Sequence, residues 1–151
     1  MVLRASSIAI YRRKNHEIQY LLVRSPAKEN WIPVTCSIKT GEQPLDAVLQ
    51  EAKQLVSLSD DDLRILKVKP IKSTLYETST EEEGKLCDYL IAELRNPFKE
   101  PKASELLDGM EWSNIYETKS KVFTRENQHV YDLLHREVMK VEEERKLKAF
   151  A

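Results

Sequence analysis

Apolar and polar residues alternate in two short segments near the N-terminus of the chain. Residues 6–11 alternate and then meet a polar run at residues 12–15, and residues 17–23 are rich in residues that favour strands. Two such segments joined by a polar turn predict a β-hairpin. The basic residues of the run, Arg12, Arg13 and Lys14, are expected in a solvated turn, with phosphate contact as the alternative. Residues 31–40 have extended character, broken by Pro33.

A helical pattern follows. Gly41 and Pro44 mark its start, because proline suits the first turn of a helix. The apolar positions then recur at helical spacing as far as about Leu58, at Leu45, Val48, Leu49, Ala52 and Val56. On a helical wheel Leu55 lies close to Val48, so we expect Leu55 to belong to the core.

The second half of the chain alternates between extended and loop patterns before a long helix. The predicted elements are an extended stretch at 63–75 with a bend at Pro70, a hairpin tip at 78–84, a strand at 85–94, a loop at 96–109, a strand at 110–115 and a helix at about 125–148. Strands followed by a helix, then strands and a helix again, predict an α+β fold with a mixed sheet in an α/β/α sandwich. We expect residues 1–151 to form one domain.

The C-terminal helix carries an apolar stripe, made of Val130, Leu133, Leu134, Val138 and Val141. An apolar stripe must be covered by something. Residues 130–138 are expected to pack on their own domain. Beyond them a charged run at 142–146 predicts a solvated helix end, so a partner surface or disorder is expected there. The predicted partner-binding residues are Val138, Val141, Leu147 and Phe150.

Composition sets limits on the class of protein. Hydrophobic residues make up 41% and charged residues 32%, which is typical of a globular protein, and the net charge is −1. That charge gives no reason to expect binding to a membrane or to DNA. The N-terminal residues have no long apolar segment, so we expect a cytoplasmic or nuclear protein. Cys36 and Cys87 form no metal-binding pattern, and both are predicted to be free thiols.

Several candidate functional residues lie between residues 31 and 58. This segment contains Trp31 and Pro33, the pair Gly41–Glu42, and Glu51 on the predicted helix. With these residues the segment resembles the Nudix box. The flanks resemble diadenosine tetraphosphate hydrolases, at Arg4–Ala5, Arg12–Arg13, Lys85, Tyr89, Ala92–Glu93 and Trp112. The resemblance covers roughly residues 2–134 and implies a Nudix fold.

The chain departs from this family where metal chemistry is expected. The resemblance implies Lys, Gly, His and Glu at positions 35, 36, 37 and 39, Arg at 50, Glu at 54 and 55, and Gly at 57. The chain has Thr35, Cys36, Ser37, Lys39, Gln50, Gln54, Leu55 and Ser57. Positions 51, 54 and 55 share a helix face, and Mg²⁺ prefers anionic oxygen ligands there. We therefore expect no metal site and no cofactor; Mg²⁺ would be needed only by an active enzyme.

Three functions remain open at this stage. The first is a catalytically inactive Nudix-like pseudoenzyme that serves as a protein-interaction or adaptor module, in which Glu42 and Glu51 are residual box positions. The second is a nucleotide or RNA-end binder that does not hydrolyse its ligand and uses Trp31, Lys85 and Tyr89. The third is a divergent but active diadenosine tetraphosphate hydrolase that relies on Glu42, Glu51 and improvised ligands.

Overall fold

The computed structural model describes residues 4–26, 30–75, 84–122 and 124–149. A seven-stranded mixed sheet forms its centre, in the order β4-β6-β1-β2-β7, with β3 paired to β1 and β5 paired to β6. The strands are β1 (Arg4–Lys14), β2 (Glu17–Arg24), β3 (Val34–Ser37), β4 (Leu63–Ile65), β5 (Ile71–Leu75), β6 (Lys85–Leu94) and β7 (Gly109–Ser113). The helices are α1 (Pro44–Val56), the short 3-10 turn η1 (Asp60–Asp62), α2 (Ile115–Lys121) and α3 (Arg125–Ala149).

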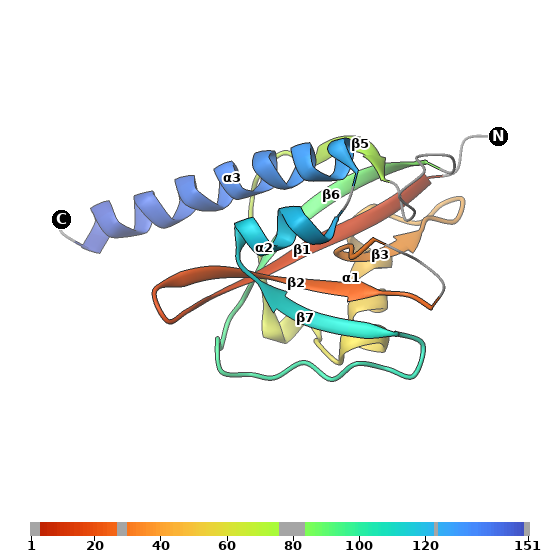
Figure 1. The fold of residues 1–151 in the computed structure, drawn as a ribbon, viewed down its shortest axis with the longest axis horizontal. Coiled ribbons are helices and arrows are strands. Elements are labelled where there is room, and N and C mark those ends of the chain that lie inside the picture. Colours follow the sequence, from red (N-terminus) through yellow and green to blue (C-terminus); the bar gives the residue numbers. More distant parts are fainter. Residues whose placement is uncertain (1–3, 27–29, 76–83, 123, 150–151) are drawn as a thin grey trace.

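The sheet lies between two helical layers (Figure 1). Helices α2 and α3 cover one face and α1 covers the other. Neighbouring side chains of β1 point to opposite faces: the Ser6 hydroxyl donates to the Pro44 carbonyl of α1, at 2.8 Å. On the other face Tyr11 packs against Tyr20, which in turn contacts Tyr131 of α3. The predicted α+β sandwich with a mixed sheet is confirmed.

The first hairpin is confirmed, but its turn is shorter than the polar run. Strands β1 and β2 pair up to Lys14 and Glu17, so only Asn15 and His16 form the turn, with φ of 55° and 63°. Arg12 is therefore a strand residue and is buried at 6% exposure. Its guanidinium lies 4.1 Å from the Trp112 ring centre, and its Nε donates to Gln19. The prediction of a solvated turn is wrong for Arg12, because the strand carries it under Trp112.

Helix α1 begins at Pro44, as predicted, and ends at Val56. Ser57 terminates it in the left-handed conformation, with φ of 58° and ψ of 36°. The loop that follows β6 completes this end of the helix. There the backbone N–H of Ser104 donates to the Leu55 carbonyl at 2.8 Å, and that of Lys102 donates to the Val56 carbonyl at 3.0 Å. These bonds satisfy helix carbonyls that have no partner within the helix.

The second half of the chain follows the predicted order with one addition. Strand β6 has the predicted bounds, and the stretch 63–75 divides into β4 and β5 around Pro70. Most of the predicted hairpin tip, residues 78–83, lies outside the described residues. Helix α2 was not predicted. A capping box begins it, in which Asn114 and Glu117 each accept the other's backbone N–H.

Helix α3 packs on the domain along most of its length. Val130, Leu134 and Val138 are fully buried, which confirms the expected self-packing. The helix continues to Ala149, which confirms the predicted helix at about 125–148. Of the two alternatives for residues 141–149, a partner surface or disorder, the helix does not favour disorder. Glu142 is also buried, at 2% exposure, and the predicted solvated end therefore does not begin there.

Ion pairs hold the end of α3 to the sheet. Arg145 forms a paired contact with Glu93 of β6, with both N–O distances 2.6 Å, and approaches Glu142 at 3.2 Å. Glu142 also meets Arg13 of β1 at 3.2 Å, and Glu93 meets Arg64 of β4 at 3.4 Å. This five-residue cluster ties α3 to three strands. A buried carboxylate needs such partners, because desolvation alone would disfavour its charge.

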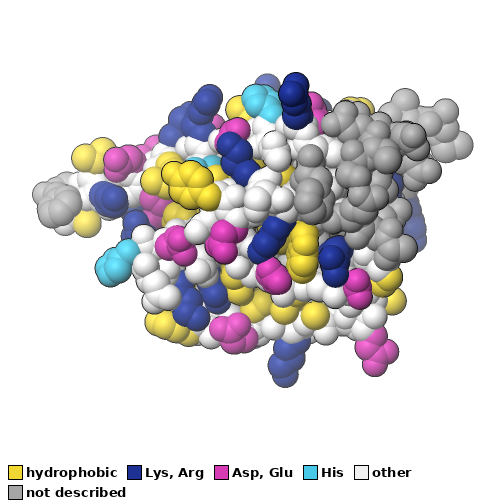
Figure 2. All heavy atoms as spheres, viewed as in Figure 1, with side chains coloured by type: hydrophobic (Ala, Val, Ile, Leu, Met, Phe, Trp, Pro, Cys, Tyr) yellow, Lys and Arg dark blue, Asp and Glu magenta, His cyan; other side chains and the backbone are white. Residues whose placement is uncertain are grey.

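The surface carries both signs of charge. Figure 2 shows Lys and Arg side chains interspersed with Asp and Glu on the face that carries α2 and α3. Within the described residues, no helix combines the length and apolar character needed to span a bilayer.

Candidate functional site

The box segment forms a shallow pocket of about 190 Å³ between β3 and α1. Two carboxylates face it, Glu42 and Glu51, together with neutral side chains and one cation. The lining residues are Cys36, Ser37, Lys39, Glu42, Ala47, Gln50, Glu51 and Gln54. The structure therefore brings together the two predicted residual box positions, and it adds Lys39 to them.

The two carboxylates of this pocket differ in their surroundings. The Glu42 side chain accepts the backbone N–H of Lys39 at 2.8 Å, so it closes the turn before α1. Burial raises the pKa of the Glu51 carboxyl above its ordinary value. No group of three or more His, Cys, Asp or Glu side chains that could hold a metal occurs in the described part of the chain. Two carboxylates beside Lys39 are a poor fit to a cation that needs several anionic oxygens.

Cys36 stands where the resemblance implies a glycine. Its side chain is half-buried, and the pKa of its thiol is raised to about 11, first by burial and then by Glu51 and Glu42. The thiolate is the reactive form of cysteine, so this thiol is poorly reactive near neutral pH. Cys87 is buried beside Ser7, and burial raises its thiol pKa to about 12. Both cysteines are free, as predicted.

Leu55 lies beside this pocket but does not line it. It is partly buried and packs against the core cluster that includes the fully buried Val48. Gln54, the next residue back, is exposed and lines the pocket. A hydrocarbon therefore occupies one expected ligand position and serves packing, whereas a neutral amide occupies the other.

Trp31 belongs to a second constellation, on the face covered by α2. The Arg24 guanidinium lies 5.0 Å and the Lys121 ammonium 5.7 Å from its ring centre. The ring packs directly on Gly109, where an added Cβ would lie 2.5 Å from a ring carbon. The indole is partly exposed, so an aromatic ring flanked by two cations is available to a ligand.

The other two predicted ligand-binding residues are not part of that constellation. Tyr89 is 2% exposed and points into the core under α3, where burial raises its pKa. Pairing with β1 places the Tyr89 side chain on the face of β6 that α3 covers, so it is not exposed to a ligand in this structure, and its role in ligand binding stays a prediction. Lys85 is half-buried at the start of β6, and two strands separate β6 from β7, on which Trp31 packs.

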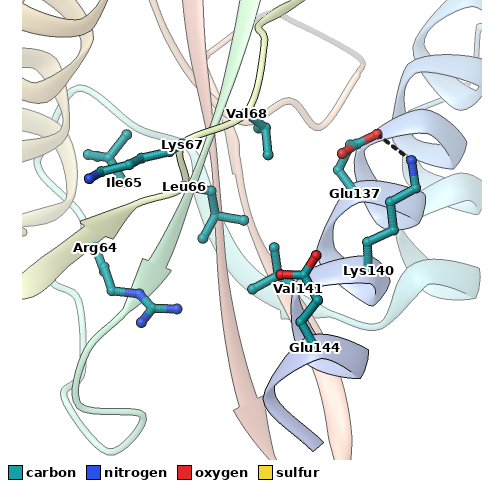
Figure 3. A pocket seen from close by; sticks show the side chains of 9 residues that line it. All are labelled: Arg64, Ile65, Leu66, Lys67, Val68, Glu137, Lys140, Val141 and Glu144. Carbon is teal, nitrogen blue, oxygen red and sulfur yellow. Dashed lines mark hydrogen bonds and ion pairs between the residues drawn. The ribbon is translucent and has the colours of Figure 1, made fainter. Parts of the chain in front are cut away.

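The predicted partner-binding residues also divide. Val138 has no exposed surface in this structure, so its role in partner binding stays a prediction that the fold does not favour. Leu147 is 71% exposed, whereas Phe150 lies outside the described residues. Val141 lines a groove of about 440 Å³ between α3 and residues 64–68, with Leu66 and Val68 opposite it (Figure 3). The rim of this groove carries Arg64, Lys67, Glu137, Lys140 and Glu144.

Comparison with known proteins identifies the fold. Similar solved structures include a Caenorhabditis elegans Ap4A hydrolase in a binary complex, at 20% identity and a TM-score of 0.81, covering 92% of this chain and 99% of that one. Another is a dihydroneopterin triphosphate pyrophosphohydrolase from Escherichia coli, at 12% identity and a TM-score of 0.67, covering 86% and 92%. A Nudix hydrolase from Mycobacterium smegmatis, described as RenU, matches at 13% identity and a TM-score of 0.70, covering 91% and 85%. No protein-family model and no curated protein sequence matches the chain. The chain has the Nudix fold.

Proposed function

We propose that this Nudix-fold chain is a pseudoenzyme that does not hydrolyse nucleotides and serves as a protein-interaction module. The observation that carries the proposal is the donor set of the α1 pocket: Glu42 and Glu51 share it with Lys39 and the amides Gln50 and Gln54. A magnesium ion stabilises the charge of a polyphosphate and helps to activate water, and it needs several anionic oxygens for its own binding. Lys39 opposes such an ion.

Protein interaction is supported by the end of α3. Leu147 is an exposed leucine, and Val141 contributes apolar surface to the groove beside β4. Exposed apolar side chains of this kind are ordinary components of protein interfaces. If this surface mediates interaction, Leu147→Glu should weaken association with a native partner, and Leu106→Glu, at an exposed leucine in the loop before β7, should not.

The experiment that tests inactivity is hydrolysis of diadenosine tetraphosphate with Mg²⁺ or Mn²⁺. We expect no turnover above that of Glu51→Gln, because that variant removes one of the two residual carboxylates. Turnover in the wild-type protein that Glu51→Gln abolishes would establish the remaining alternative, a divergent active hydrolase.

A second function, nucleotide binding without cleavage, is favoured by one observation. Trp31 presents a partly exposed ring between Arg24 and Lys121, which suits a base next to phosphate groups. Titration with ATP should then quench indole fluorescence in the wild-type protein. Trp31→Leu should abolish binding in calorimetry, whereas Glu51→Gln should leave it unchanged. If ATP does not bind, nucleotide binding is excluded and only the protein-interaction proposal remains.

A further inference from the structure

A separate hollow of about 650 Å³ lies between the β1–β2 turn and the end of α3. Arg13, Asn15, His16 and Lys146 line it. Figure 1 shows this turn and the end of α3 at one end of the sheet and β3 toward the other, and β3 contributes Cys36 and Ser37 to the α1 pocket. The hollow is therefore separate from the α1 pocket, although Lys146 places it next to Leu147 at the end of α3.

The lining of this hollow has one chemical character. All four side chains can donate hydrogen bonds, two of them are cations at neutral pH, and none is a carboxylate. Among the described residues, Asn15, His16 and Lys146 make no side-chain hydrogen bond or ion pair. Arg13 has one ion pair, at 3.2 Å to Glu142, and half of its side chain remains exposed. Four side chains that can donate hydrogen bonds thus face the hollow, and most of their donor groups have no partner among the described residues.

The two walls of the hollow are fixed relative to each other. Glu142 of α3 pairs with Arg13 of β1, and Arg145 pairs with Glu93 of β6 through two contacts of 2.6 Å. Lys146 follows Arg145 directly in the helix. The hollow is therefore largely formed before a ligand arrives, which lowers the entropy lost on binding. Lys146 and Lys148 also offset the partial negative charge at the end of α3.

The turn residue His16 adds a local argument. Its φ of 63° lies in the left-handed region, and glycine is the residue that fits this position of a two-residue hairpin turn without strain. A histidine side chain here therefore costs stability. Strained residues of this kind concentrate at functional sites, where the side chain itself is used.

We propose that this hollow binds the phosphate groups of a small phosphorylated ligand. Arginine and lysine supply the charge-assisted hydrogen bonds that phosphate oxygens prefer, and Asn15 and His16 add further donors. A compact ligand fits better than a polynucleotide, because the net charge of the chain is −1 and acidic side chains are interspersed with basic ones on the face seen in Figure 2. A long nucleic acid would need an extended basic track.

Calorimetric titration of the full chain with tripolyphosphate, at about 0.1 M ionic strength, tests the proposal. The informative variants are Lys146→Gln and His16→Gly, because neither side chain has a structural partner and glycine relieves the turn. Each should weaken binding, Lys146→Gln by roughly tenfold, since it removes a charge-assisted hydrogen bond. The matched control is Lys148→Gln. Lys148 follows Lys146 by about half a helical turn and does not line the hollow, so this variant should bind like the wild-type protein.

Four outcomes would overturn the proposal. They are undetectable binding by the wild-type protein, equal weakening in Lys148→Gln, and loss of binding in Lys39→Gln, which would move the ligand to the α1 pocket. The fourth is tighter binding of a single-stranded RNA oligonucleotide than of tripolyphosphate, which would replace the small ligand by a nucleic acid. None of these outcomes depends on whether the chain hydrolyses nucleotides.

Discussion

Glu51 and Glu142 are both glutamates on helices that cover the sheet, but their surroundings differ. Glu142 of α3 is buried and meets Arg13 and Arg145 at 3.2 Å each. Glu51 of α1 lies in an open pocket where no described cation pairs with it, and burial raises the pKa of its carboxyl. The α3 face thus uses its carboxylates for structure. On the α1 face the resemblance implies several carboxylates for metal binding. Among the described residues that line the pocket there, only Glu42 and Glu51 are carboxylates, and Leu55 packs against the core instead.

The largest expected effect lies on the α3 face. Arg145→Ala would leave Glu93 and Glu142 with fewer cationic partners inside the sheet–helix interface. We expect a loss of about 2–3 kcal/mol, below the usual cost of breaking a buried pair because Arg145 is partly exposed. For a domain of this size that lowers the melting temperature by roughly 5–10 °C. Arg136→Ala, on the exposed side of α3, should change it by less than about 2 °C. Equal effects of the two variants would mean that the cluster contributes nothing specific.

The next effect compares two neighbouring positions on α1. Leu55→Glu would place a carboxylate among partly buried core residues, so we expect a loss of about 2 kcal/mol and no Mg²⁺-dependent rise in melting temperature. Gln54→Glu adds the same charge to the exposed pocket and should be nearly neutral. Thermal melts with and without Mg²⁺ check both variants. A melting temperature of Leu55→Glu that rises with Mg²⁺ would show that Leu55 faces an open site.

A smaller effect concerns Ser57, which ends α1 where the resemblance implies a glycine. Its left-handed backbone is strained for any residue with a Cβ. Ser57→Gly should therefore stabilise the protein by about 0.5 kcal/mol, measured by urea unfolding. Ser57→Ala retains the Cβ and should not. If Ser57→Gly were destabilising, the Ser57 side chain would have to make a stabilising interaction that outweighs the strain of its backbone.

The smallest effect is a dependence on pH. The Tyr20 hydroxyl lies 2.7 Å from Nδ1 of His135, and burial lowers the pKa of His135 below its ordinary value despite nearby Asp132. The folded state thus favours the neutral ring. Its contribution is complete above the ordinary pKa of about 6.5 and is lost as the pH falls through the lower folded-state value. The melting temperature should therefore fall less between pH 7.5 and pH 5 in His135→Asn than in the wild-type protein. His129→Asn, at an exposed position, should behave like the wild-type protein.

Local sequence signals predicted the helices and strands better than they predicted which side chains those elements bury. Pro44 and the apolar spacing after it located α1, and the pattern of residues 85–94 located β6 with its observed bounds. Helix α2 has only seven residues and little apolar periodicity, but the pair Asn114 and Glu117 is a capping signal that could have located it.

Burial of charged residues could not be predicted in this way, because their partners are distant in the sequence. Glu142 is buried since Arg13, at the other end of the chain, reaches it. Arg12 is buried since β7 brings Trp112 over it. Tyr89 was expected at a ligand from the resemblance, and its burial could not be predicted because the face of β6 that it occupies depends on pairing with β1. The α1 pocket, by contrast, was located through the resemblance, because its residues are close together in the sequence, on β3, on α1 and on the turn between them.

The position of β1 has a consequence for how the chain folds. Strand β1 precedes the other described strands in the sequence, yet its parallel partner is β6, with Arg4 opposite Leu86. Pairing over so long a separation closes a large loop and slows folding. During synthesis β1 can form its hairpin with β2, but one of its edges stays open until β6 has left the ribosome. An open apolar strand edge invites pairing with other chains, so this interval is when the protein most needs protection from aggregation.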